Sequence, residues 1–297
     1  MSDENKGLLL GFLGVSLFAL TLPLTKVLVA AIGIYEANFL RASLTGVIAL
    51  GFLLISRAKL PQSRQEWRLL IPIIIAIGLG FPIGTAYAMQ TIPPGQGGVV
   101  LGLTPLLTAI IGASISNQKL SNRFWIAASI GFIVITLYSL NKNQWVISQG
   151  EIGLLVASIS AGLGYAKAGK LSQIMDSKEV ISWVMTMSLI FNIPLAILFL
   201  GNDFMGLSEK LFHPGPLLAL LSLAIITMYI ANFFWYQGLS IGGIAKVGQL
   251  LLLQPLITLF VSSLFFGESV GLFDYTVCFM LIVIVLYCRR TPISSLQ

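Results

Sequence analysis

Two cations lie inside long apolar runs, where a charged side chain is costly and usually faces a cavity or a partner helix. Arg41 lies about seven residues, or about 10 Å, into the run 34–55, counting 1.5 Å per residue. Lys246 lies a few residues into the run 244–266. Either could bind a carboxylate, and an arginine can do so bidentately. The alternatives are a fixed hydrogen bond from Arg41 to backbone carbonyls or Glu36, and a surface anchor for Lys246.

Neutral polar and aromatic side chains accompany these cations. Gln96 is the counterpart of Lys246 at a spacing of 150 residues, and both begin a run where backbone amides could face an anion. Gln249 follows Lys246 by one helical turn and shares its face. An aromatic-lined pocket with few polar groups suits amphipathic or apolar solutes. The candidate substrate-binding residues are Asn38, Arg41, Tyr87, Gln90, Gln96, Tyr165, Asn232, Tyr236, Lys246 and Gln249. For any one of them the alternative is a helix–helix hydrogen bond or a place in an interfacial aromatic belt.

Ten apolar runs supply the elements that must position these side chains. The chain of 297 residues is 57% hydrophobic and 9% charged, whereas a soluble domain carries about 25% charged residues. A helix needs about 20 residues to cross a bilayer, and the runs do not alternate as barrel strands would. The sequence therefore predicts an all-α integral membrane protein with ten transmembrane helices. They are expected at approximately 7–29, 34–55, 67–89, 94–116, 122–140, 151–171, 179–200, 215–237, 244–266 and 271–289.

The second half of the sequence repeats the first about 150 residues on. Residues 98–118 (GVVLGLTPLLTAIIGASISNQ) align with residues 248–268 (GQLLLLQPLITLFVSSLFFGE), so that Pro105 falls on Pro255. The expected units are residues 1–143 and 144–297, each with five spans. An odd number of spans inverts the second unit in the membrane. Inverted repeats typically build a transport pathway at their interface.

Basic residues are distributed unevenly among the loops. Eleven, from Lys6 to Arg290, lie on the side of both termini, against three on the other. The positive-inside rule therefore predicts cytoplasmic N- and C-termini. The net charge of +6 reflects membrane insertion and not nucleic-acid binding. With two cysteines and one histidine, and no phosphate-binding loop or enzyme-like cluster, we expect no metal, no cofactor and no catalytic residue.

The order of these segments resembles the drug/metabolite transporter superfamily, in particular its ten-span EamA-domain branch. The signature of a proline followed by Gly-Glu at the end of a half is intact as Pro255 with Gly267–Glu268. In the first half Asn117–Gln118 replaces Gly-Glu after Pro105. The other segments that carry the resemblance are FALTLPLTK (18–26), NFLRA (38–42), YAMQTI (87–92), LTPLLTAIIGASISNQK (103–119), AGLGYAKAGK (161–170), WYQGLSI (235–241) and QPLITLFVSSLFFGESV (254–270).

The resemblance implies an inner-membrane metabolite carrier, often an exporter of amino acids or related compounds, with structural roles for Pro105, Pro255 and Glu268. Acidic residues lie only near span ends or in loops. Facilitated diffusion or exchange is therefore favoured over proton antiport through Glu36 or Glu151. The alternatives are a multidrug exporter, a metabolite importer, a membrane receptor or assembly factor, and a membrane enzyme. The expected partners are a small-molecule substrate and the lipid bilayer, for a monomer or a homodimer.

Overall fold

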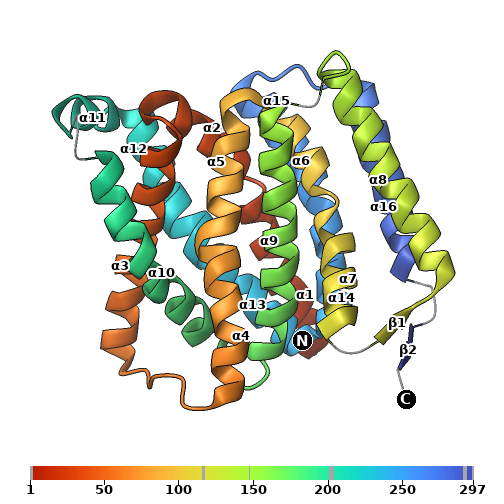
Figure 1. The fold of residues 1–297 in the computed structure, drawn as a ribbon, viewed down its shortest axis with the longest axis horizontal. Helices are drawn as coiled ribbons and strands as arrows, with labels where there is room; N and C mark the ends of the chain where they lie inside the picture. The colour runs from red at the N-terminus through yellow and green to blue at the C-terminus, as the bar shows by residue number, and fades with distance from the viewer. Residues whose placement is uncertain (1–2, 116–117, 147, 201–203, 290–292, 296–297) are drawn as a thin grey trace.

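The computed structural model describes residues 3–115, 118–146, 148–200, 204–289 and 293–295. Asn117 and Arg290, which entered the sequence argument, lie outside the described residues. Among the described residues, nine helical stretches are long and apolar enough to cross a membrane, and α16 adds a tenth, shorter apolar helix. The predicted all-α fold of ten membrane helices, built as two inverted five-helix repeats, is confirmed (Figure 1).

Several spans consist of more than one helical segment. The five spans of the first repeat are α1 (Asp3–Phe18) with α2 (Thr21–Ile32); α3 (Ile34–Ser56); α4 (Arg64–Ile75) with η1 (Ala76–Gly80) and α5 (Phe81–Thr91); α6 (Pro94–Leu101) with α7 (Thr104–Ile115); and α8 (Asn122–Lys142). Those of the second repeat are α9 (Gln149–Leu171); α10 (Ser177–Leu200); α12 (Pro214–Leu221) with η2 (Ser222–Ile230) and α13 (Ala231–Gly242); α14 (Ile244–Val247) with η3 (Gly248–Leu253) and α15 (Gln254–Phe266); and α16 (Leu272–Arg289). The short helix α11 (Phe204–Leu211) and the antiparallel strands β1 (Gln118–Leu120) and β2 (Ile293–Ser295) complete the described elements.

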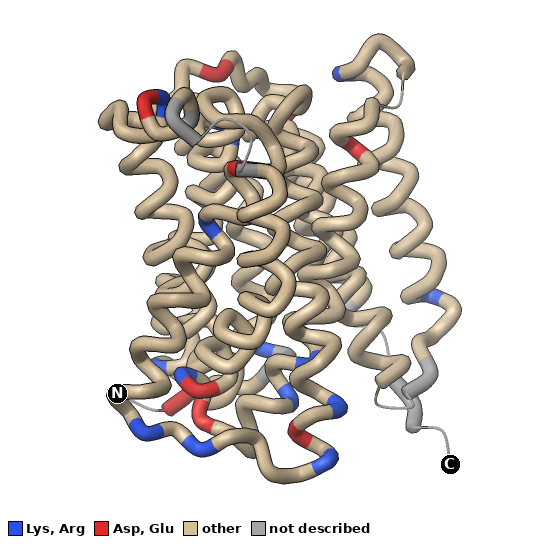
Figure 2. Tube along the Cα trace, turned by 60° about the vertical axis from the view of Figure 1, so that its left-hand side comes forward, with Lys and Arg blue, Asp and Glu red and all other residues tan. Residues whose placement is uncertain are grey.

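The start of α1 and the strand β2 lie at one end of the helical bundle (Figure 1), which we call the terminal end; the opposite end is the distal end. Figure 2 shows that most of the lysine and arginine residues gather near the terminal end. The third span starts at Arg64 and the eighth ends at Gly242, so both are longer than the apolar runs predicted for them. The reason is that a helix continues through the polar residues at the membrane surface, which hydropathy alone excludes.

Serine and glutamate pairs begin two of the spans. The Ser148 hydroxyl oxygen accepts a hydrogen bond from the Glu151 amide at 3.4 Å, and the Glu151 carboxylate accepts one from the Ser148 amide at 2.9 Å. Ser63 and Glu66 form the same capping box at the start of α4. Such boxes satisfy two of the free amides that every helix start leaves exposed. The Glu151 carboxylate also accepts a hydrogen bond from Asn143, so it has a structural role at the distal end.

The most extensive helix contacts join the two repeats. The pairs are α3 with α10, α1 with α13, α5 with α9, α7 with α9, α6 with α15, and α8 with α16, and in every pair one helix comes from each repeat. The pair α1–α13 is the symmetry equivalent of α5–α9, since each combines the first span of one repeat with the third of the other. The interface between the repeats therefore runs through the middle of the protein.

Glycines let the backbones approach closely in both of these equivalent pairs. A Cβ atom built on Gly84 of α5 would lie 2.6 Å from the Gly153 carbonyl oxygen of α9. A Cβ atom on Gly238 of α13 would lie 2.8 Å from the Gly11 amide nitrogen of α1. Both distances are too short for a side chain, so the packing of α1 on α13 and of α5 on α9 requires glycine.

We expect Gly238→Ala to destabilise the protein by about 1 to 3 kcal/mol, because the added methyl group would force α1 and α13 apart. The matched control is Gly51→Ala in α3, where a Cβ atom would meet nothing within 4 Å. That change should be neutral or stabilising by up to about 1 kcal/mol, because alanine favours the helix. Thermal unfolding in detergent measures both. Equal melting temperatures for the two variants would contradict the close-packing argument.

Candidate substrate-binding site

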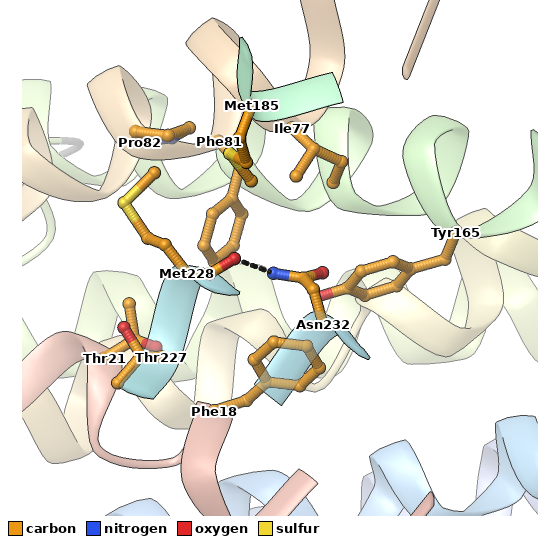
Figure 3. Close-up of a pocket in the computed structure, with 10 residues that line it drawn as sticks. All are labelled: Phe18, Thr21, Ile77, Phe81, Pro82, Tyr165, Met185, Thr227, Met228 and Asn232. Carbon is orange, nitrogen blue, oxygen red and sulfur yellow. Dashed lines mark hydrogen bonds between the residues drawn. The ribbon is translucent and has the colours of Figure 1, made fainter. Parts of the chain in front are cut away.

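A cavity lies at the interface of the repeats, near the middle of the bundle. It is walled by helices of the first repeat (α1, α2, η1 and α5) and of the second (α9, α10, η2 and α13). Its volume is about 20 Å³, enough for about one water molecule. A metabolite would therefore need the walls to move apart. The lining residues, shown in Figure 3, are Phe18, Thr21, Ile77, Phe81, Pro82, Tyr165, Met185, Thr227, Met228 and Asn232.

Irregular helical segments surround this cavity. The π-helical segments η1 and η2 occupy equivalent places in the third and eighth spans. Ile77 lies within η1, and Thr227 and Met228 lie within η2. The first span is interrupted between α1 and α2, directly between the lining residues Phe18 and Thr21. Such departures from the α-helix are frequent at functional sites, and in membranes they are tolerated where they line a cavity or are buried in protein.

Polar side chains bind the backbone carbonyls of these irregular segments. Asn232 donates a hydrogen bond to the Met228 carbonyl oxygen at 2.9 Å, drawn in Figure 3. Thr45 of α3 donates to the Ala224 carbonyl oxygen at 3.1 Å, and Asn192 of α10 donates to the Gly78 carbonyl oxygen at 3.3 Å. These bonds stabilise the irregular backbone, which a purely apolar interior would leave unsatisfied.

The aromatic rings of Phe18 and Tyr165 line one side of the cavity, and Trp235 packs against both of them. The ring of Tyr165 lies 5.9 Å from that of Phe18 and 5.8 Å from that of Trp235, measured between centroids. Phe18 and Trp235 are 6.3 Å apart in an edge-to-face arrangement. The Trp235 indole nitrogen, the neighbouring Tyr236 hydroxyl and the Asn232 amide oxygen are buried without a hydrogen-bond partner. This side of the site can accept an apolar or aromatic group and offers three free polar atoms at its margin.

Arg41 lies between α2, α3 and α5, next to the cavity wall. Its guanidinium donates to the Thr25 hydroxyl at 2.7 Å, to the Pro82 carbonyl oxygen at 2.6 Å and to the Thr85 hydroxyl at 3.0 Å. Pro82 itself lines the cavity, and Thr25 lies one turn beyond the lining residue Thr21 on the same helix. The alternative partner Glu36 does not bind Arg41 in this conformation; neutral oxygens from α2 and α5 do.

The charge of Arg41 has no acidic partner. The side chain is 1% exposed, and no acidic group in the described part of the chain forms an ion pair with it. Its Nε and both polar atoms of Asn38, one turn earlier on α3, are buried without a partner. Asn38, Arg41 and Thr45 share one face of α3 because three- and four-residue steps stay aligned. A buried cation costs on the order of several kcal/mol unless an anion compensates it.

The structure divides the sequence-predicted site residues into two groups. Tyr165 and Asn232 line the cavity; Arg41, Asn38 and Tyr236 are buried in the surrounding helices. The others lie near the ends of the bundle. At the distal end the Tyr87 hydroxyl donates to Gln149, Gln90 is exposed, and Gln96 is buried in the first turn of α6. At the terminal end Lys246 forms an ion pair with Glu4, and Gln249 is exposed.

Sequence reasoning missed most of the lining residues and both π-helical segments. Phe81, Met185, Thr227 and Met228 look like ordinary core residues of apolar runs. In the third span Gly78, Gly80 and Pro82 were an available signal of irregular backbone. The eighth span has no glycine or proline between Pro216 and Gly238. An irregular segment in the eighth span could have been predicted only from its equivalence to the third span, where glycine and proline give the signal.

Comparison with known proteins places this geometry in a family. The model of the EamA-like transporter family matches twice, at residues 5–140 and 148–288. The uncharacterized transporter YdeK of Bacillus subtilis is 33% identical over 290 residues, which cover 98% of this chain and 99% of that protein. The chloroplastic triose phosphate/phosphate translocator of Flaveria pringlei is 23% identical over 202 residues, covering 64% of this chain and 46% of that protein.

A solved crystal structure has the same fold. It superposes with a TM-score of 0.64 and covers 95% of this chain and 97% of its own, at 17% sequence identity. That likeness concerns the fold alone. The two family matches take in nearly the whole chain, one in each half, in keeping with helix pairs that join the two repeats across the central interface. The chain therefore belongs to the EamA-like transporter family, and it is a membrane transporter and not an enzyme.

Proposed function

We propose that this transporter moves a small metabolite that bears a carboxylate, an amino acid or a related compound, by alternating access. The observation that supports this substrate class is the buried guanidinium of Arg41, which has three neutral partners and no anionic one. A substrate carboxylate would compensate its charge. Arg41 Nε is free of hydrogen bonds, so a carboxylate could bind through Nε and one terminal nitrogen in the bidentate geometry that arginine favours.

The rest of the cavity fits the remainder of such a substrate. The Thr21–Thr25 stripe of α2 connects the cavity to Arg41. The Phe18, Tyr165 and Trp235 rings would accept an apolar substituent. The amide oxygen of Asn232, which has no partner, is an acceptor for a substrate ammonium or hydroxyl group. A carboxylate, a polar group and an apolar substituent describe an amphipathic metabolite.

A second candidate is a phosphorylated or inorganic anion. The observation that favours it is the similarity to the translocator named for triose phosphate and phosphate. An arginine binds phosphate as readily as carboxylate, because both present paired oxygens to its planar group. None of the described lining residues is basic, and Arg41 lies beside the cavity wall, whereas a doubly charged phosphate ordinarily needs more than one cation.

Alternating access would follow from the inverted repeats, which can exchange conformations across their interface. We propose that the terminal end faces the cytoplasm of a cell whose inner membrane holds the protein, because basic residues gather there (Figure 2). Export would then be uptake at the terminal end and release at the distal end, with the direction set by the substrate gradient.

We propose facilitated diffusion or exchange as the transport mode. The acidic groups that a proton-coupled carrier would use have fixed partners near the distal end. Glu151 belongs to a capping box, Glu268 accepts a hydrogen bond from the Gly95 amide at 2.7 Å, and Asp274 is paired with Lys142 at 2.7 Å. None of these three carboxylates lines the central cavity.

Counterflow in proteoliposomes tests the substrate class. Vesicles loaded with unlabelled amino acids should accumulate the labelled ones, and Arg41→Lys should weaken apparent affinity roughly tenfold or more, since a charge-assisted hydrogen bond contributes about 1.5 to 3 kcal/mol. Thr85→Val is a milder variant that keeps the charge and removes one partner of Arg41. The matched control is Lys246→Ala, which removes an exposed cation outside the cavity.

The outcomes separate the candidates. Unchanged flux in a folded Arg41→Ala protein, with folding verified by thermal unfolding, would contradict carboxylate binding at this site. Exchange of inorganic phosphate, without flux of any amino acid, would favour the second candidate instead. Equal losses in the Arg41 and Lys246 variants would mean that positive charge acts through the surface and not through the cavity.

A pH gradient tests the transport mode. With equal substrate concentrations on both sides of sealed vesicles, we expect an imposed gradient of protons to drive no net substrate movement, because no described acidic residue reaches the cavity. The measurement is accumulation of labelled substrate with and without a protonophore. Protonophore-sensitive accumulation would establish proton coupling, and Glu151→Gln, which keeps the size of the side chain, would then show whether Glu151 is responsible.

A further inference from the structure

The fourth and fifth spans of each repeat can be aligned residue by residue, because positions 150 apart in the sequence are equivalent. The inverted arrangement places equivalent residues at opposite ends of the bundle. A contact at the distal end therefore corresponds to a pair of equivalent positions at the terminal end, on the equivalent helices. The two ends can therefore differ in the strength of the hydrogen bonds and ion pairs that join the repeats.

At the distal end, buried or part-buried carboxylates join the two repeats. Glu268, after α15, accepts a hydrogen bond from the Gly95 amide in the first turn of α6 at 2.7 Å. Asp274 of α16 accepts one from the Tyr138 hydroxyl of α8 at 2.7 Å and pairs with Lys142 at the same distance. Asp274 is 3% exposed. Hydrogen bonds to a charged group are about twice as strong as those between neutral groups.

At the terminal end the equivalent positions carry residues without a carboxylate. Tyr138 corresponds to Cys288 and Asp274 to Phe124, and these two do make contact: the Cys288 thiol lies 3.8 Å from the Phe124 carbonyl oxygen. A thiol is a weak hydrogen-bond donor. The Cys288–Phe124 contact is therefore weaker than the equivalent Tyr138–Asp274 hydrogen bond at the distal end. Glu268 corresponds to Gln118, which is uncharged.

In the part of the terminal end that the structure describes, one ion pair joins the repeats, Lys246 of α14 with Glu4 of α1. Both side chains are about half exposed, at 53% and 54%. Exposed pairs contribute little, because water and salt screen them. Among the side chains that the structure describes, the stronger links between the repeats therefore lie at the distal end, and an opening there must break the charge-assisted hydrogen bonds of Glu268 and Asp274.

We infer that Glu268 and Asp274 act as a latch that holds the distal end closed, so that the substrate-free transporter rests in the state that opens at the terminal end. This inference depends on the alternating access proposed above. The Glu268 carboxylate also lies at the N-terminus of α6, where the helix dipole favours negative charge. Substrate binding would have to supply the free energy that releases the latch.

Hydrogen–deuterium exchange of the full chain in lipid nanodiscs, without substrate, tests the latch. Glu268→Gln should shift the equilibrium roughly tenfold towards distal opening. Exchange should then become faster at the distal segments 91–97 and 267–275 and slower at the terminal segments 118–126 and 243–250. The matched control is Glu209→Gln, which neutralises an exposed acidic residue of α11 outside the latch.

Symmetry offers the converse experiment. Gln118→Glu places a carboxylate at the equivalent terminal position and should slow exchange at the terminal segments. The double variant Glu268→Gln with Gln118→Glu should reverse the wild-type pattern. Tyr138→Phe removes one partner of Asp274 and should act like Glu268→Gln, whereas Tyr275→Phe, on the same helix as Asp274, should have no effect.

Faster distal exchange in Glu268→Gln without slower terminal exchange would show a local helix cap and overturn the latch. So would exchange identical to the wild type at both ends. The readout needs no substrate, so it is independent of the flux assay. Flux in the wild type together with unchanged exchange in the variants would overturn the latch alone. Reciprocal exchange changes without flux of any amino acid would leave the latch standing and overturn the proposed substrate class.

Discussion

A backbone inside a membrane cannot leave its amides and carbonyls unpaired, and this constraint governs the whole structure. Lipid offers no hydrogen bonds, so each span must be helical unless protein satisfies the backbone groups that are freed. This protein departs from the α-helix at a few places: the break between α1 and α2, the π-helical segments η1 and η2, and the prolines that begin α7 and α15. Thr258 donates to the Ala19 carbonyl oxygen at the first of these breaks at 3.2 Å. At these places side chains form hydrogen bonds with backbone groups that have no partner within the helix.

The same constraint explains why the irregular segments gather at the central cavity. Polar side chains that form hydrogen bonds with free backbone groups are tolerated in a membrane only where neighbouring helices bury both partners. In this protein that place is the interface of the repeats. Arg41 is the extreme case, because its guanidinium binds a carbonyl and two hydroxyl groups yet keeps an uncompensated charge. A group held this way is costly in a closed, empty site. An anionic substrate that binds Arg41 would compensate this charge, and the free energy gained would favour substrate binding.

Duplication gave the protein two ends of similar architecture, and later divergence made them unequal. Glycine-mediated packing is kept in both equivalent helix pairs, α1–α13 and α5–α9. Pro105 and Pro255 likewise start equivalent helical segments, in the first turns of α7 and α15. The carboxylates of Glu268 and Asp274 occur at the distal end only. Shared features of this kind preserve the scaffold, whereas the unshared ones can give the two conformations different free energies.

The order of the amino acids is enough to predict the ten-helix membrane fold, the repeat and the transporter class. Apolar runs of about 20 residues and a recurrence at 150 residues are properties of local order and need no knowledge of contacts. It also named Arg41, Tyr165 and Asn232, because a polar group or ring deep in an apolar run is unusual wherever it packs.

Which of the candidate substrate-binding residues lie together at the central cavity depends on how the helices pack in three dimensions. Gln90, Lys246 and Gln249 are polar or charged like the central group, but they lie near the ends of their spans, away from the cavity. Among the residues deeper in the spans, the sequence does not specify the face that each helix turns inward. The partners of Arg41 come from α2 and α5, 16 to 44 residues away in the sequence. Such pairings depend on how helices cross, which is set by side-chain packing across the whole interface and is not encoded in any single segment.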